Sequence, residues 1–457
     1  MRKIHLVTFG CQMNKLDSEL AAEALAEAGH QLVASEDEAD TVIFNTCSVR
    51  DHAEQRVLSR LSQLRGRRES EPGFRLGVIG CFAERTGESL LRRLPFLDFV
   101  AGTRQFLRLP EILARLESGQ THLLGDAPES VTHLQSAHSR QRHQGTQAYL
   151  SVLRGCSNHC AYCVVPAVRG GEVSRPGPEI VEEARRLVAG GAREIILLGQ
   201  NIDAYDRQGE GLAGLLQALD QAIPEEDGLR RIRFVTSHPR DIDRRLLEAI
   251  ALLPRVARHF HMPAQSGSDA VLTRMRRGYS RSQYEEKVAM IREILPDAQI
   301  ASDFIVGFPG ETEADFQASL ELLTEARFQN SFIFKYSPRP GTLAERQYPD
   351  DVPLPEKKSR HARLLARQEE VSRERAQSLL GSRQRVLVEG LSKRDQRRLT
   401  GRTAGNLICV FPPPATGEVR PGDLVDVEIF DATPLALYAK LCLDASLTPS
   451  GEGTGNV

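Results

Sequence analysis

The chain has 457 residues, of which 40% are apolar and 26% are charged, and its formal net charge is -2. This length is too great for one ordinary hydrophobic core and predicts about two to four domains. The near-neutral charge excludes a polycation, so any contact with nucleic acid must come from a local basic surface. No apolar stretch is long enough for a signal peptide or a membrane span, so we expect a cytoplasmic protein with no membrane partner.

Residues 1–125 alternate between strand-like and helix-like patterns. A helix-like stretch, Gln12–Ala28, is rich in Ala, Leu and Glu and stops at Gly29. Short apolar runs rich in β-forming residues lie at Ile4–Phe9, Thr41–Asn45 and Leu76–Ile79. This alternation predicts an open α/β domain with a mostly parallel sheet, and we expect the polar segment 126–146 to be a linker.

The alternation resumes in residues 147–378, where helical stretches such as Glu179–Ala189 and Thr312–Arg327 separate six candidate strands. These strands are expected at Leu150–Arg154, Ile195–Leu198, Ile232–Thr236, His259–Met262, Ile300–Val306 and Phe332–Tyr336. Six βα units in series predict an incomplete (β/α)6 barrel, shorter than the closed barrel of eight units. An open barrel leaves a mouth at its side, which suits a macromolecular substrate.

The pattern changes again in residues 379–443, after a charged helical stretch. Short strands joined by turns with Gly and Pro are expected at Val386–Glu389, Leu407–Phe411, Leu424–Phe430 and Leu437–Leu441. They predict a small all-β barrel. The remaining residues, 444–457, form a tail rich in Gly, Ser and Thr that is expected to be disordered.

Eight cysteines carry most of the functional information. Three of them, Cys156, Cys160 and Cys163, lie close together directly after a predicted strand. Thiolates are ligands of iron–sulfur clusters and of zinc, and three of them would leave one iron of a four-iron cluster open to a small molecule. A zinc site completed by His159 or another residue is the alternative, but no second pair with zinc-type spacing lies nearby.

A second set of cysteines, Cys11, Cys47 and Cys81, is spread along the N-terminal domain. Each follows a predicted strand. The carboxyl ends of strands in an open parallel sheet lie at one edge, so these three thiols are expected to converge. Three unrelated buried thiols are the alternative, because free cysteine is a common core residue. Convergence predicts a second cluster with three ligands and an open iron.

The motifs around these cysteines resemble a known family. The C-x3-C-x2-C spacing with Tyr162 before the last cysteine resembles the radical S-adenosylmethionine superfamily. Other motifs follow in order along nearly the whole chain, among them GCQMN at 10–14, NTCSVR at 45–50, LLGQN at 197–201, DFIVGFPGET at 303–312 and YSPRPGT at 336–342. Together they resemble the methylthiotransferases of that superfamily, and GCQMN resembles the branch that acts on isopentenyl adenosine in tRNA.

This resemblance implies two 4Fe-4S clusters with different tasks. The cluster held by Cys156, Cys160 and Cys163 would bind S-adenosylmethionine at its open iron and yield a 5′-deoxyadenosyl radical, while the other cluster would supply sulfur. The implied reaction is methylthiolation of C2 of N6-isopentenyl adenosine at position 37, in the anticodon stem-loop of tRNA. It would use two molecules of S-adenosylmethionine and an electron donor such as a flavodoxin or ferredoxin.

Two other functions stay open at this point. A methylthiotransferase of the same family could act on threonylcarbamoyl adenosine in tRNA or on a ribosomal protein. A non-catalytic iron–sulfur protein could bind RNA, although structural clusters normally have all their irons ligated by the protein. No catalytic residue is predicted beyond the cluster ligands.

Four further residues are candidates for binding S-adenosylmethionine, because each lies at or just after the end of a predicted barrel strand: Gln200, Gln265, Ser266 and Gly307. For Gly307, a tight turn between strand and helix is an equal alternative. His238 and His261 are expected to be structural. Cys409 and Cys442 match no motif and are expected to be core thiols of the C-terminal barrel.

A basic stretch opens the C-terminal module, with seven Arg and Lys residues between Arg383 and Arg402. On its own it is either a solvated charged loop or a surface that follows RNA phosphates. The family resemblance implies an RNA-binding barrel and favours the second interpretation.

Overall fold

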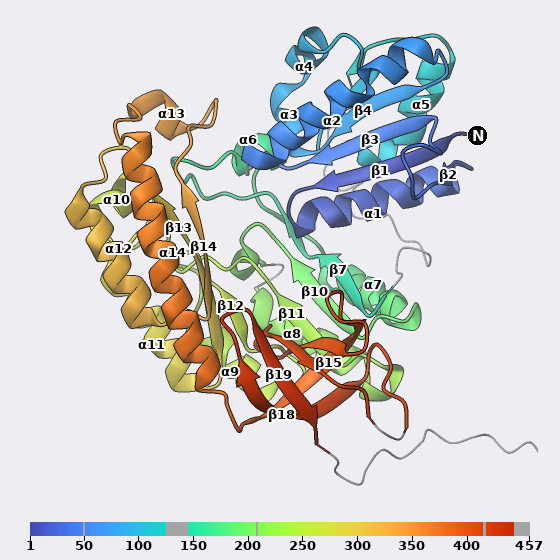
Figure 1. Ribbon diagram of the computed structural model, residues 1–457. Coiled ribbons are helices and arrows are strands. Elements are labelled where there is room, and N and C mark those ends of the chain that lie inside the picture. The colour runs from blue at the N-terminus through green and yellow to red at the C-terminus, as the bar shows by residue number, and fades with distance from the viewer. Residues whose placement is uncertain (49–50, 125–144, 207–208, 415–416, 443–457) are drawn as a thin grey trace, which may run out of the picture. The chain divides into compact units, whose positions relative to one another are not determined.

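The computed structural model describes residues 1–48, 51–124, 145–206, 209–414 and 417–442 (Figure 1). The chain forms two compact units, Met1–Gln368 and Glu369–Val457. The expected tail and all but the last two residues of the expected linker lie outside the described residues. No helix in the described ranges is long and apolar enough to cross a membrane.

The N-terminal part of the first unit is built on a six-stranded parallel sheet with the order β2-β1-β3-β4-β5-β6. The strands are β1 (Lys3–Phe9), β2 (Gln31–Leu32), β3 (Thr41–Thr46), β4 (Arg75–Ile79), β5 (Phe99–Ala101) and β6 (Leu123–Leu124). The three strands expected from the sequence are confirmed. The other three have only two or three residues, too few to produce a pattern.

Helices cover both faces of this sheet, as a buried parallel sheet requires. They are α1 (Gln12–Glu27), α2 (Asp51–Ser70), α3 (Cys81–Thr86), α4 (Glu88–Arg93) and α5 (Leu109–Glu117), with a short 3-10 helix η1 (Phe106–Arg108). Leu16 and Leu20 of α1 share one core cluster with Leu113 of α5, whereas Leu61 of α2 and Phe82 of α3 belong to the cluster on the other face.

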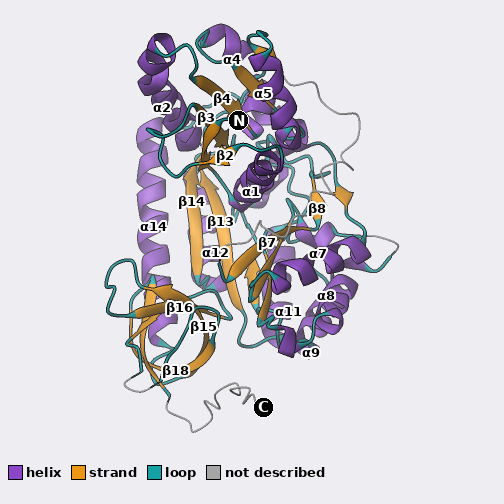
Figure 2. Ribbon diagram, turned by 90° about the vertical axis from the view of Figure 1, so that its right-hand side faces the viewer, coloured by secondary structure: helices purple, strands orange, loops and turns teal. Residues whose placement is uncertain are grey.

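The rest of the first unit contains six βα strands: β7 (Gln147–Ser151), β10 (Glu194–Leu198), β11 (Arg231–Phe234), β12 (His259–His261), β13 (Gln299–Val306) and β14 (Asn330–Lys335). The last five lie where they were expected. The first was expected at Leu150–Arg154 but begins three residues earlier and ends at Ser151, because Leu153–Arg154 form a separate antiparallel pair. They form two parallel three-stranded sheets, β7-β10-β11 and β12-β13-β14, which keep the chain order of an incomplete barrel. Single backbone bonds join the two sheets, for example from Ser237 N to His261 O at 2.9 Å. The strands lie inside a layer of helices (Figure 2).

These helices are α7 (Gly177–Ala189), α8 (Gly211–Ala222), α9 (Arg244–Leu252), α10 (Asp269–Arg274), α11 (Arg281–Ile294), α12 (Glu313–Ala326), α13 (Leu343–Gln347) and α14 (Leu354–Gln377). The capping box of α12 is present as the sequence predicts, because Thr312 and Asp315 exchange hydrogen bonds. Shorter elements surround the cysteine loop: the antiparallel pair β8 (Leu153–Arg154) and β9 (Val173–Ser174), the helix α6 (Val165–Arg169) and the 3-10 helix η3 (Ile202–Ala204).

The second unit contains a closed five-stranded barrel with the order β15-β16-β17-β19-β18. Its strands are β15 (Arg383–Leu391), β16 (Leu399–Thr403), β17 (Ile408–Phe411), β18 (Leu424–Ala432) and β19 (Ala436–Leu441). Four of the five were expected. Cys409 is fully buried in the barrel core, as predicted, whereas Cys442 is only partly buried.

Candidate iron–sulfur centres

The loop with Cys156, Cys160 and Cys163 begins at a glycine that no other residue can replace without distortion. Gly155 has φ +80°, and a Cβ there would lie 1.9 Å from the backbone oxygen of Gly171. Its N–H donates to Oε1 of Gln200 at 2.5 Å, and Cys156 N donates to Gly170 O at 3.1 Å. These bonds fix the first cysteine directly after β8.

The far side of the same loop is held by the barrel and by a buried arginine. Ala161 N donates to Met275 O at 2.9 Å. Arg277, only 5% exposed, places Nη1 at 3.3 Å from Sγ of Cys160 and at 3.3 Å from the hydroxyl of Tyr162. A buried guanidinium directed at a cysteine sulfur suits a thiolate ligand, because the cation compensates the negative charge.

Of the cysteines of this loop, Cys156 is buried, and Cys160 and Cys163 are partly buried. Burial, followed by the neighbouring Cys160, raises the pKa of Cys163 to about 12. Burial also raises the pKa of Cys156. Such thiols become thiolates only when a cation replaces the proton, and the irons of a cluster would provide that charge.

Cys11, Cys47 and Cys81 meet at one edge of the N-terminal sheet. They follow the neighbouring strands β1, β3 and β4, whose ends are level because Phe9 pairs with Thr46 and Asn45 with Ile79. The thiol of Cys11 is hydrogen-bonded with that of Cys47, which lowers the pKa of Cys11 to about 6. The structure therefore places these three cysteines at the carboxyl ends of neighbouring strands, with the thiols of Cys11 and Cys47 close together.

A buried ionic group lies between the two cysteine sets. Asp17 of α1 pairs with Arg154 Nη2 at 3.0 Å and with Arg169 Nη2 at 2.8 Å, and none of these three side chains is more than 6% exposed. Burial raises the pKa of the Cys81 thiol, and the positive charge of Arg169 acts in the opposite direction. One positive charge is left over beside the N-terminal thiols, so this site is suited to an anionic, thiolate-ligated centre.

No three Cys, His, Asp or Glu side chains of the described residues converge as ligands of one metal ion. A zinc site would need such convergence. Each cysteine of a cubane cluster binds a different iron, so the three sulfur atoms need not meet around one point.

The four residues predicted to bind S-adenosylmethionine differ in their surroundings. Gln200 supports the cysteine loop through its bond with Gly155. Gln265 has φ +68° and is 8% exposed, and its Oε1 has no hydrogen-bond partner among the described residues. It therefore keeps a free acceptor for a ligand.

The other two residues make contacts within the protein. Ser266 is 1% exposed, and its Oγ accepts from Ser268 N at 3.2 Å. The stem of Lys357 fills the space above Gly307, because a Cβ at Gly307 would lie 2.3 Å from Cγ of that lysine. The group that approaches Gly307 closely is thus the side chain of Lys357 and not a ligand. This supports the alternative that Gly307 serves a tight turn between strand and helix. The Gly307 N–H donates to Glu311 Oε2 at 2.6 Å.

The two histidines also bond within the protein. Burial, with Arg277 and Arg240 nearby, lowers the pKa of His238 to about 2, so its ring is neutral. Its Nδ1 accepts from Arg240 N at 3.3 Å. His261 pairs through Nε2 with Asp303 at 2.9 Å. These contacts agree with the structural role expected for both.

A cavity of about 500 Å³ opens beside the cysteine loop. Its lining is largely polar and includes four acids, Glu172, Asp203, Asp206 and Asp241, and one base, Arg240. Burial raises the pKa of Asp203 to about 7, although the carboxylate accepts hydrogen bonds from Ser237 Oγ and His238 N. This lining does not suit an apolar prenyl group.

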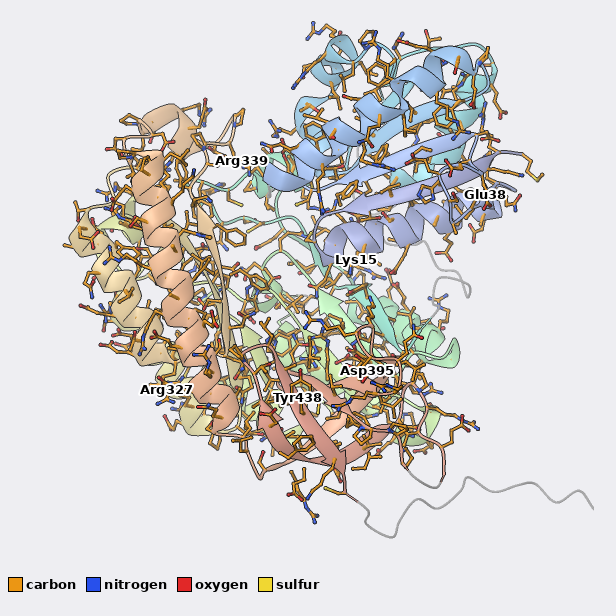
Figure 3. The ribbon with its side chains drawn as sticks, viewed as in Figure 1. Lys15, Glu38, Arg327, Arg339, Asp395 and Tyr438 are labelled. Carbon is orange, nitrogen blue, oxygen red and sulfur yellow. The ribbon has the colours of Figure 1, made fainter. Side chains whose placement is uncertain are left out.

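The basic stretch of the C-terminal barrel is largely paired with acids of the same barrel. Arg385 pairs with Asp426, Arg402 with Glu389, and both Arg397 and Arg398 with Asp395. Asp395 is labelled in Figure 3. Lys393 and Arg394 are exposed and have no ionic partner in the described part of the chain. These two side chains are the ones most available to phosphates.

Sequence reasoning did not identify Asp17, Arg169 and Arg277 as site residues. Asp17 and Arg169 are 152 positions apart, and Arg277 is 117 positions from Cys160. No local motif connects such residues. The only signal was the position of Arg154 and Arg169, which flank the cysteine motif.

Three family models match consecutive parts of the chain. Residues 3–102 match Uncharacterized protein family UPF0004, residues 150–323 match the Radical SAM superfamily, and residues 377–442 match the TRAM domain. These limits agree with the N-terminal domain, the incomplete barrel and the C-terminal barrel.

Curated relatives match over nearly their whole length. A protein of Geobacter sulfurreducens named tRNA-2-methylthio-N(6)-dimethylallyladenosine synthase is 44% identical over 96% of this chain and 98% of its own. Proteins of the same name from Chromobacterium violaceum and Rhodopirellula baltica are 42% and 41% identical, each over 96% of this chain and over 98% and 95% of their own.

Solved structures of radical S-adenosylmethionine enzymes share the fold at low sequence identity. The methyltransferase TsrM from Kitasatospora setae superposes with a TM-score of 0.56 at 14% identity, over 76% of this chain and 75% of that one. The cobalamin-dependent enzyme OxsB gives a TM-score of 0.51 at 12% identity, over 81% of this chain and 56% of that one. These similarities establish the architecture alone.

Proposed function

The chain belongs to the family of the tRNA-2-methylthio-N6-dimethylallyladenosine synthases, and from this we propose that it methylthiolates C2 of N6-isopentenyl adenosine at position 37 of tRNA. It is a radical S-adenosylmethionine enzyme. The observation that carries the proposal is the near full-length identity to these relatives, together with two cysteine sets at the carboxyl ends of strands.

We assign the 4Fe-4S cluster expected of the superfamily to Cys156, Cys160 and Cys163. When bound, this cluster and S-adenosylmethionine supply a radical strong enough to activate the C2–H bond of adenine. Arg277 compensates the charge of Cys160 from the barrel side, and Gln200 holds the start of the loop. Gln265 offers its free carbonyl oxygen to S-adenosylmethionine.

We assign a second 4Fe-4S cluster to Cys11, Cys47 and Cys81. The support is their place on three neighbouring strands and the excess positive charge of the group formed by Asp17, Arg154 and Arg169. This cluster would be the site of sulfur supply, which the first cluster cannot provide while it binds S-adenosylmethionine.

The C-terminal barrel matches a TRAM domain, which suggests RNA binding, and we propose that it binds tRNA near the anticodon stem-loop. Lys393 and Arg394 would contact phosphates, because other basic side chains of the stretch are already paired. The target base must leave its stack to reach a site inside the incomplete barrel. We further propose a cytoplasmic location and an electron donor such as a flavodoxin or ferredoxin.

Mass spectrometry of tRNA nucleosides from cells with and without this protein tests the proposal. The 2-methylthio form of isopentenyl adenosine should disappear on deletion and return with the wild-type gene but not with C156A. An anaerobic assay with isopentenyl tRNA, threonylcarbamoyl tRNA and a ribosomal protein in parallel then tests the substrate. Modification of either of the last two, with isopentenyl tRNA untouched, would overturn the assignment of substrate.

A further inference from the structure

The last strand of the incomplete barrel carries two exposed phenylalanines. Phe332 and Phe334 of β14 are 48% and 37% exposed, whereas Ile333 between them is 7% exposed. Successive side chains of a strand point to opposite faces, so the two rings share one face of β14 and Ile333 lies on the other. Neighbouring exposed rings form an apolar patch, and such patches are typical of ligand-binding surfaces.

Contacts across β13 identify this face as the interior of the barrel. Phe332 pairs with Asp303 in the parallel ladder, and His261 Nε2 lies 2.9 Å from the Asp303 carboxylate. The rings of His261 and Phe332 are 6.3 Å apart, so these three side chains share one face. The opposite face carries Phe304, whose ring lies 5.9 Å from that of Phe328, directly after α12. Helices cover that opposite face, so the two exposed rings line the interior.

The interior face of the other half of the barrel is already covered. Ile196 and Leu198 of β10 belong to the core cluster of the N-terminal domain, which also contains Leu16 and Leu20 of α1. Among the described residues, β14 is the strand of the incomplete barrel that leaves large apolar side chains exposed. The apolar surface that remains open inside the barrel is therefore in its second half.

This open apolar surface leads to the cysteine loop. Ile305 of β13 pairs with Phe334 in the ladder and packs against a buried cluster that includes Ala161. Tyr162 packs against the same cluster, and both Ala161 and Tyr162 belong to the cysteine loop. Ile305 N also donates to the backbone oxygen of Gln265 at 2.9 Å. A group bound on the two rings would thus lie on the strands that lead to the S-adenosylmethionine site.

We propose that Phe332 and Phe334 bind the isopentenyl group of the target adenine and thereby select the prenylated base. The inference rests on the proposed function and names the residues that recognise its substrate. The isopentenyl group is apolar and requires apolar partners, which the cavity beside the cysteine loop, with four acids and one base, does not offer. The two rings offer that surface, and their flat faces can also contact the purine. A threonylcarbamoyl group, which carries a carboxylate, would lose its hydration there.

The test measures the binding of two anticodon stem-loop RNAs that differ only in the isopentenyl group on adenosine 37. The holoenzyme is reconstituted anaerobically, and both affinities are measured with S-adenosylmethionine present and no reductant. Phe332→Ala and Phe334→Ala are compared with wild type, and the iron content of each protein reports on its folding. Leu252→Ala is the control for a general loss of apolar surface, because Leu252 is 78% exposed at the end of α9.

Wild type should prefer the prenylated RNA, and each Phe variant should lower this preference by roughly 10-fold or more. The reason is that a single methylene in an apolar pocket is worth about 10- to 200-fold in selectivity. Leu252→Ala should keep the preference of wild type. If an Ala variant does not fold, Leu at the same position carries the test, with a smaller loss of preference because the side chain stays apolar.

Two results would overturn the inference and leave the proposed function standing. One is an unchanged preference in the folded Phe variants, and the other is an equal loss of affinity for both RNAs. A wild-type enzyme with no preference for the prenylated RNA would overturn the proposed substrate together with the role of the two rings.

Discussion

Arg277 donates from Nη1 to Sγ of Cys160 at 3.3 Å, from a position in the barrel that follows α10. The same guanidinium is fixed by a bond from Nη2 to Pro263 O at 3.0 Å and from Nε to the Tyr279 hydroxyl at 3.0 Å. Because three bonds hold it, the guanidinium is in place before any cluster assembles.

Replacing Arg277 by Met should therefore make the potential of the radical SAM cluster more negative. The loss of a charge-assisted hydrogen bond worth about 1.5–3 kcal/mol should slow formation of 5′-deoxyadenosine by roughly 10- to 100-fold. The exposed neighbour Arg276, replaced by Met, is the control. The potential is measured by an EPR-monitored titration in a protein whose Cys11, Cys47 and Cys81 are replaced by Ala. If adding Arg277→Met to this protein leaves the potential unchanged, the role of Arg277 is contradicted.

The two cysteine sets should hold separate clusters, because they lie on different sheets. Replacing Cys156, Cys160 and Cys163 by Ala should halve the iron content and abolish 5′-deoxyadenosine formation. Replacing Cys11, Cys47 and Cys81 should also halve the iron but leave some reductive cleavage of S-adenosylmethionine. Full iron in either triple variant after anaerobic reconstitution would show that this assignment is wrong.

The exposed cations of the C-terminal barrel should contribute unequally to tRNA binding. Replacing Lys393 and Arg394 by Gln should weaken binding and reduce the log–log salt slope by up to about one unit for each lost phosphate contact. Replacing Arg397 and Arg398 should do less, because Asp395 already pairs with both. Arg420, which pairs with Glu418 on the same barrel, is the control. Equal effects of the two pairs in filter-binding titrations would contradict the ranking.

Asp203 should make the stability of the protein depend on pH. Burial raises its pKa from 3.8 to about 7, so the folded state binds more protons than the unfolded state between these values. Its stabilising contribution is complete below about pH 4 and is lost as pH rises through about 7. The stability of Asp203→Asn relative to wild type should therefore increase from pH 5 to pH 8, by on the order of 2–3 kcal/mol. Denaturant titrations at both pH values would reveal the gain, and an equal difference at both would rule out this titration.

The positions of the cysteines could be predicted from two local sequence patterns. One is an apolar run that identifies a strand, and the other is a cysteine just after that run. Apolar runs such as Thr41–Asn45 identify strands, and a cysteine just after a strand of a parallel sheet must lie at its carboxyl edge. Gly155 likewise sits where a tight turn follows β8. Strand β16 was not predicted because its buried positions 401 and 403 hold Gly and Thr rather than large apolar residues, and its pairing depends on β15 and β17.

The partners of the clusters could not be predicted in the same way. Whether Arg169 meets Asp17 depends on how α1 packs against the loop after α6, and that packing is set by many apolar side chains. Gly307 shows the same limitation. Its sequence context fits a ligand-binding turn, but the residue that fills its open side, Lys357, comes from the distant helix α14.

The apolar core of the N-terminal domain does not end at residue 124. Ile196 and Leu198 of β10 belong to the same buried cluster as Leu16 and Leu20 of α1. A polypeptide of residues 1–124 would leave that side of α1 uncovered, and exposed apolar surface of this kind promotes association. We expect such a fragment to aggregate on expression. The N-terminal domain could therefore be joined to a different barrel only if that barrel also covered this side of α1.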